Sequence, residues 1–131
     1  MARTKIAISD LTANAGTDTP AGTTIDAALV TAGAYVDLDE CPPEELVLRI
    51  TNTHGVAHIV TIPKGDNPPS TVAGAITKSV GATTGDVLIG PFTGAKIAQA
   101  GSAAEDSHTM HVDFVTDHAG KITALRVPRT A

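Results

Sequence analysis

The sequence predicts an all-β fold, either an antiparallel β-sandwich or a jelly-roll-like barrel of about 8–10 short strands. Apolar and polar residues alternate in many short segments, as half-buried strands require. Gly, Pro, Asn and Asp recur between these segments at intervals of about ten residues, which is the turn spacing of all-β domains. No segment has the apolar period of a convincing helix.

The N-terminal part is predicted to contain one short strand and a long polar loop. Lys5 to Leu11 alternates, with Ile6 and Ile8 on one face of the strand. Residues 12–22 are rich in Gly, Pro, Asn, Asp and Thr, which favour loops. Two interpretations stay open: an edge strand of the chain's own domain, or an arm that docks on a neighbouring subunit. We therefore divide the chain into residues 1–22, the strand or arm with its loop, and residues 23–131, a single β-sandwich domain.

The next part is predicted to form two short strands before an acidic turn. Thr23 to Val30 begins as a strand, although residues 27–29 can turn helically, and Tyr35 to Leu38 is a second extended piece. Five carboxylates between residues 37 and 45 surround the Cys41-Pro42-Pro43 corner. Such oxygens suit Ca²⁺, but their spacing matches no EF-hand loop. A solvated acidic turn is the preferred interpretation.

The clearest strand pattern lies between residues 45 and 63. Leu46, Leu48 and Ile50 share one face of a predicted strand, and the turn Asn52 to Gly55 follows it. A second strand ends at Pro63, because proline has no amide hydrogen for a β-ladder. We predict that these two strands form a β-hairpin.

The C-terminal half continues with short strands. Residues 110–116 alternate, with Met110, Val112 and Phe114 on the core face and His111 and Asp113 on the other. Further strands are expected at Ala75–Val80, Asp86–Ile89, Ala95–Gln99 and Lys121–Val127, with a polar loop at Gly101–Ser107 and a turn at Asp117–Gly120.

Composition and charge limit the classes of function. The core must be mainly aliphatic, because only Tyr35, Phe92 and Phe114 are aromatic among 131 residues, and we hypothesise that self-association or docking adds stability. The net charge is −5 without a Lys/Arg cluster, which argues against nucleic-acid binding. Cys41 is alone, and the sequence has neither a membrane-spanning run nor a signal-peptide pattern. We expect a protein that folds in the cytoplasm without disulfides and does not enter membranes.

No motif indicates catalysis, a metal or a cofactor. The sequence lacks the G-x-S-x-G, H-E-x-x-H and phosphate-loop signatures. His54 and His58 have helical spacing, but Gly55 and the following strand exclude that helix. A zinc site needs three or four converging ligands, and His108 and His111 have opposite strand parity. We therefore expect no enzyme, no cofactor and no metal site among the histidines, which are His54, His58, His108, His111 and His118.

The loop from Pro63 to Ser70 is the most distinctive segment outside the strands. Its Lys64-Gly65-Asp66-Asn67 part has turn-forming residues, and Pro68-Pro69 favours a stiff extended conformation. A rigid exposed loop loses little entropy on binding, which suits a docking element. An ordinary sandwich loop is the equally weighted alternative.

Several segments together resemble a family of small virion proteins. These are LRITNT (48–53), VTIPKGDNPP (60–69), IGPF (89–92), KIAQ (96–99), HVDF (111–114) and ITALRVPRT (122–130). They resemble the capsid decoration proteins, or auxiliary head proteins, of tailed bacteriophages that infect actinobacteria. The resemblance spans roughly residue 23 to the C-terminus and consists of strand and turn sequences, not catalytic signatures.

The resemblance implies a structural protein on the capsid surface of a virion, made in the host cytoplasm. It implies the major capsid protein as partner and a homotrimer at local threefold positions. Another virion role, as a tail-tube, head–tail connector or receptor-binding module, is the alternative. The expected shell or neighbour contacts lie in the N-terminal strand and the proline-rich loop: Arg3, Lys5, Ile6, Ile8, Pro63, Lys64, Asp66, Asn67, Pro68 and Pro69.

Overall fold

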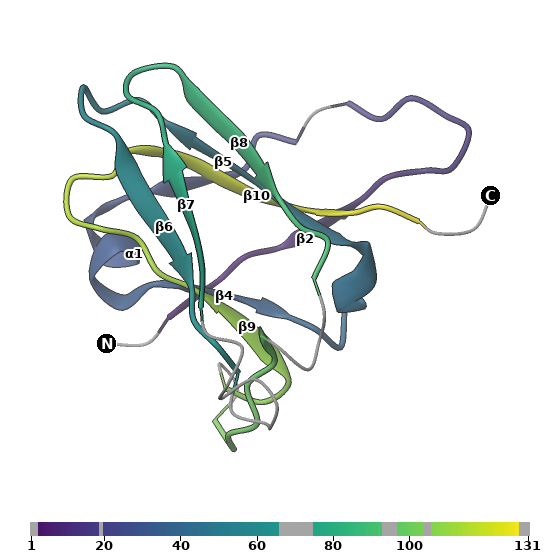
Figure 1. Cartoon of the computed structure of the whole chain (residues 1–131). Coiled ribbons are helices and arrows are strands. Elements are labelled where there is room, and N and C mark those ends of the chain that lie inside the picture. Colours follow the sequence, from purple (N-terminus) through teal and green to yellow (C-terminus); the bar gives the residue numbers. More distant parts are fainter. Residues whose placement is uncertain (1–2, 19, 66–74, 93–96, 104–105, 129–131) are drawn as a thin grey trace.

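The chain folds into a β-sandwich of two layers (Figure 1). The fold is seen in a computed structural model, which describes residues 3–18, 20–65, 75–92, 97–103 and 106–128. The first layer has the strand order β2 (Ile8–Asp10), β10 (Gly120–Arg126), β5 (Leu46–Asn52), β8 (Gly85–Ile89), and β3 (Thr23–Ile25) also pairs with β10. The second layer combines β1 (Thr4–Lys5), β4 (Ala34–Asp37) and β9 (Thr109–Val112) with the pair β6 (His58–Ile62) and β7 (Ile76–Val80). An antiparallel bridge between Thr61 and Asp113 joins these two groups of strands.

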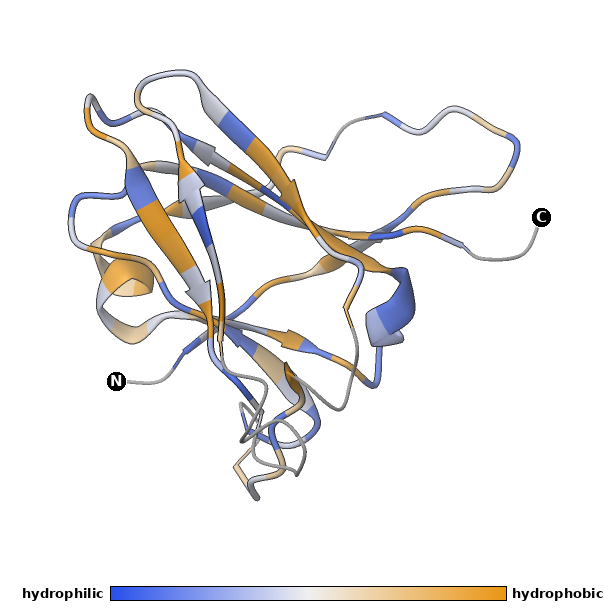
Figure 2. Cartoon of the chain, in the orientation of Figure 1, coloured by the Kyte–Doolittle hydropathy of each residue, from blue (hydrophilic) through white to orange (hydrophobic). Residues whose placement is uncertain are grey.

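One aliphatic core lies between the layers. Leu48 and Ile50 from the first layer and Val36 and Met110 from the second are fully buried members of the same cluster. Figure 2 shows that β6 and β8 are largely apolar, with a hydrophilic position near the start of each strand. The described strands form open sheets and no closed barrel. The predicted all-β sandwich is therefore confirmed, although two strand pairs, β1–β4 and β2–β10, are parallel.

The predicted hairpin between residues 46–52 and 58–62 is wrong. Both strands exist, but β5 pairs with β10 and β8, whereas β6 pairs with β7 in the other layer. The chain crosses between layers after Asn52, whose side-chain amide donates to the carbonyl oxygen of Val56 at 2.9 Å. Alternation determines which face of a strand is buried, and it does not determine the neighbouring strand.

The predicted N-terminal strand is split between the two layers. Thr4 and Lys5 pair with β4, and residues 8–10 pair with β10. Ile6, between the two halves, is 1% exposed and belongs to the core, and its amide donates to the carbonyl oxygen of Tyr35 at 2.9 Å. Residues 4–10 therefore connect the two layers along one edge of the sandwich.

A short helix, α1 (Ala27–Ala32), occupies the segment where a helical turn was an open possibility. It begins because the Asp26 carboxylate accepts from the amide of Leu29 at 2.9 Å, and Leu29 is buried against the core. A 3₁₀ turn, η1 (Pro43–Glu45), precedes β5. Within the described ranges, no helix is long and apolar enough to cross a membrane.

Two predicted strands near the C-terminal half differ from the structure. All four residues of β9 are buried, including His111, which the alternation placed on the solvent face. The strand predicted at 95–99 begins at residues outside the described ranges, and Ile97 is helical. An isolated antiparallel bridge joins Ala100 to Ser107 just before β9. The predictions at 75–80, 86–89 and 121–127 agree with β7, β8 and β10 within two residues.

Candidate functional site

Four of the described residues that were predicted to form contacts lie in the second layer or directly next to one of its strands. Arg3 and Lys5 are two residues apart at β1, which pairs with β4, so their side chains lie on the same face of the sheet. Pro63 and Lys64 directly follow β6, which lies on the other side of β9. Ile6 and Ile8 face the core instead, Ile8 as a half-buried residue opposite Ala124. The rest of the predicted set, Asp66, Asn67, Pro68 and Pro69, lies outside the described residues.

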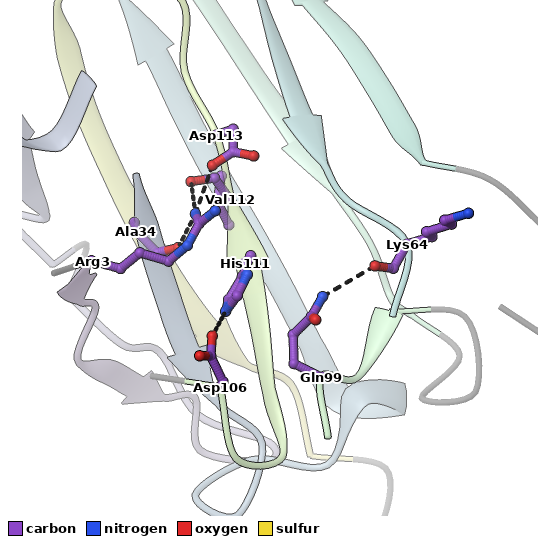
Figure 3. A network of polar contacts seen from close by, with 8 residues as sticks. All are labelled: Arg3, Ala34, Lys64, Gln99, Asp106, His111, Val112 and Asp113. Carbon is purple, nitrogen blue, oxygen red and sulfur yellow. Dashed lines mark hydrogen bonds and ion pairs between the residues drawn. The ribbon is translucent and has the colours of Figure 1, made fainter. Parts of the chain in front are cut away.

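Arg3 ties the N-terminal strand to β9 (Figure 3). Its Nη1 lies 2.6 Å from Oδ1 of Asp113 and 3.3 Å from the carbonyl oxygen of Ala34. The Arg3 and Asp113 side chains are 20% and 41% exposed, so the pair is partly shielded from solvent. A charged pair with a further backbone bond holds an otherwise short strand in place.

Gly33, which precedes β4, makes room for this ion pair. Its φ is 85°, in the region that glycine tolerates best. A Cβ there would collide with Nη1 of Arg3 and would lie 2.7 Å from Oδ1 of Asp113. The lack of a side chain at residue 33 therefore allows Arg3 to reach across β4.

The acidic turn between residues 37 and 45 is a set of ion pairs. Lys5 bonds to Glu40, and this bond raises the pKa of the Lys5 ammonium group. Asp39 lies 2.7 Å from Nδ1 of His108, and Glu45 lies 3.3 Å from Nε of Arg126. Three of the five carboxylates thus have basic partners, and Asp39, Glu40 and Glu44 are exposed, as a solvated acidic turn requires.

The start of the proline-rich loop is anchored beside β9. Pro63 is half-buried and Lys64 is exposed. The carbonyl oxygen of Lys64 accepts from Nε2 of Gln99 at 3.1 Å, and Gln99 is only 7% exposed (Figure 3). A buried amide that holds the backbone fixes where the loop leaves the second layer.

A histidine–carboxylate pair lies between these two anchors. Nε2 of His111 is 3.0 Å from Oδ1 of Asp106, and Figure 3 shows His111 between Arg3 and Gln99. The register places Lys5, Tyr35 and His111 in one row across β1, β4 and β9. Sequence parity placed His111 on this face as a solvent-facing residue, but the structure buries it beside Asp106.

Exposed apolar side chains occur on both layers. Ile59 is 50% exposed on β6, and Val115 is 42% exposed beyond β9. Ile59 and Val115 each lie two residues from the antiparallel bridge between Thr61 and Asp113, on the second layer. Leu88, 67% exposed on β8, lies on the first layer and faces away from this pair.

Three histidines that are separated in sequence meet at one end of the sandwich. Nε2 of His58 lies 2.9 Å from Nδ1 of His54, and the rings of His58 and His118 stack with centroids 5.7 Å apart. His118 is 3% exposed, and burial, with a smaller contribution from His58, lowers its pKa. The prediction that His54 and His58 lack a helix is correct, but sequence reasoning missed His118 as their neighbour.

A cavity of about 320 Å³ lies beside α1 and His118. This is at the lower end of the size range of small-molecule sites, roughly 300–1,000 Å³. Within the described ranges, no three His, Cys, Asp or Glu side chains are placed to hold a metal ion. The cavity walls include Asp26, Val30, Thr31, Thr116, Asp117 and His118.

No protein-family model matches the chain, and neither a curated protein nor a solved structure matches it. The fold and the geometry of the second layer, together with the sequence resemblance, are therefore the basis of a functional proposal.

Proposed function

We propose that this chain is a structural protein of a bacteriophage virion that binds the outside of the capsid and stabilises it. Its partner is the lattice of the major capsid protein, and it associates with itself as a homotrimer. It acts by binding, without a catalytic group or a cofactor.

One geometric observation carries this proposal. The described parts of both predicted contact segments, at Arg3 and Lys5 and at Pro63 and Lys64, lie on the second layer on either side of β9. The exposed side chains of Ile59 and Val115 lie near the bridge that joins β6 to the end of β9. Charged, polar and apolar side chains are combined there as in many protein interfaces.

The dimensions suit binding through one face. A standard protein interface takes about 800 Å² from each partner, and the chain exposes 6678 Å² in total. One outer layer can therefore supply a contact to the shell while the other side remains free for solvent or neighbouring copies. Repetition over a lattice turns modest affinity per copy into strong overall attachment.

Cosedimentation with undecorated phage capsids tests the proposal. Purified protein at increasing concentration is mixed with capsids, and the bound copy number is measured in the pellet. We expect saturation at a number that matches one set of equivalent lattice positions. Light scattering of the free protein shows whether the trimer exists before docking.

Absence of binding to expanded capsids, with rings or stacked tubes in the free protein, would replace decoration by a connector or tail role.

A further inference from the structure

Three turns meet at the end of the sandwich that contains the histidine stack. They connect β5 to β6, β7 to β8, and β9 to β10. The amide of Thr53 donates to the carbonyl oxygen of Ala119 at 2.8 Å, and the amide of Thr83 donates to that of His54 at 2.7 Å. Asn52 adds a bond to the carbonyl oxygen of Gly81 at 3.2 Å. A few hydrogen bonds thus hold the three turns together around the rings.

A single hydrogen bond joins the rings of His54 and His58. Their nitrogens are 2.9 Å apart, so one nitrogen must donate an N–H and the other must accept it. This bond ties the turn between β5 and β6 to the first residue of β6, whose ring stacks on His118.

His118 is held as a neutral ring. Its Nε2 lies 3.0 Å from the carbonyl oxygen of Thr51, which can only accept, so Nε2 carries the hydrogen. Nδ1 is buried and has no hydrogen-bond partner among the residues that the structure describes. A proton on Nδ1 would therefore lack an acceptor and would place a charge against the stacked ring of His58.

We infer that the His54–His58–His118 stack is an acid-sensitive latch, in which protonation of His118 separates the three turns and opens this end of the sandwich. The charged groups that share the neighbouring cavity with His118 are Asp26 and Asp117. Both are exposed, so water screens their attraction while the end is closed. After opening, water and these carboxylates stabilise the imidazolium.

The direction of the pH effect follows from proton binding. The pKa of His118 in the closed form is below the ordinary value of 6.5, because of burial and then of His58. The open form therefore binds a proton that the closed form excludes. The ratio of open to closed protein rises by up to about tenfold per pH unit below pH 6.5, until the pH reaches the pKa of the closed form. Neither the latch nor its effect depends on binding to a capsid.

Amide hydrogen exchange measured by NMR between pH 7.5 and 5.0 tests the latch. After correction for the intrinsic exchange rate, protection of Thr53 and Thr83 is expected to fall as pH falls below 6.5. Protection of amides in the β5–β10 ladder is expected to change much less, because those strands are far more extensively paired.

Two variants make the test specific. His118→Gln keeps an N–H donor near Thr51 and removes the titrating ring, so it is expected to abolish the acid response. His108→Asn removes an exposed histidine paired with Asp39 and is expected to keep the response. An unchanged acid response in H118Q would overturn the latch.

A direct titration covers the case in which H118Q does not fold. The ring resonances of His118 in the unaltered protein are expected to titrate with a midpoint below 6.5. A midpoint at or above 6.5, with unchanged exchange at Thr53 and Thr83, would contradict the inference.

Discussion

Replacement of Ile6 by Ala tests whether the N-terminal strand is an integral part of the fold. Ile6 is 1% exposed and lies between the halves of the strand that pair with different layers. The change removes about three buried carbon groups at roughly 0.8 kcal/mol each and leaves a cavity that adds to this cost. We expect a loss of about 2–4 kcal/mol in the free energy of unfolding.

The assay is thermal and urea unfolding, followed by circular dichroism. For a domain of this size, such a loss corresponds to a fall in Tm of roughly 6–16 °C. Ala7→Ser is the matched control, because Ala7 is exposed and adjacent to Ile6 in the connection between β1 and β2, and it should change stability by less than about 0.5 kcal/mol. Equal stability of I6A and the unaltered protein would refute the packing of Ile6 and favour an undocked arm.

Other perturbations give smaller or more local effects. Arg49→Ala breaks a two-bond ion pair with Asp86 on the surface and should cost about 0.2–1 kcal/mol, as measured by a double-mutant cycle in urea. The Arg49 hydrogen bonds also lower the pKa of Asp86, so the contribution of this pair should be lost as pH falls below the ordinary aspartate value of 3.8, and a flat profile there would count against the pair. Gly33→Ala should lower stability by more than about 1 kcal/mol, because φ is positive and a Cβ collides with Arg3; a Tm equal to that of the unaltered protein would be inconsistent with this geometry. Cys41 is fully buried, and burial raises the pKa of its thiol, so a thiol reagent should label it only after unfolding, and rapid labelling of native protein would contradict its position.

The sequence was sufficient to predict the buried face of a half-buried strand, because burial on one side leaves a local alternating pattern, whereas it failed for β9, which is buried on both sides. Residues 46–52 show this most clearly: Leu46, Leu48 and Ile50 are all 0% exposed, as the pattern predicts. The same pattern could not identify strand partners, since a strand with one apolar face fits either layer. The crossover after Asn52 depends on its side-chain bonds to distant turns, which no local spacing encodes.

The site was predictable only in part for the same reason. Basic residues at 3 and 5 could be assigned to a strand, but the contact between Arg3 and Asp113 spans 110 residues and depends on strand order. The ring of His118 stacks on that of His58 because the fold brings the turn after β9 next to β6, although the two residues are 60 positions apart in the sequence. Predicting it would have required the topology first. A histidine immediately after an aspartate in a turn gives no local signal of a stacked neighbour.

Binding to a capsid is proposed to use the outer face of the second layer. Two single substitutions separate the faces, Ile59→Lys on the second layer and Leu88→Lys on the first, at side chains that are 50% and 67% exposed. Both place a charge at an exposed apolar position on a strand, so their effects on folding should be similar and small.

Cosedimentation of these two variants with undecorated capsids is the most direct measurement. The proposed face predicts at least a tenfold weaker apparent affinity for I59K, which corresponds to about 1.4 kcal/mol, and an affinity for L88K close to that of the unaltered protein. Loss of binding in L88K with normal binding of I59K would place the contact on the first layer and contradict the proposed face.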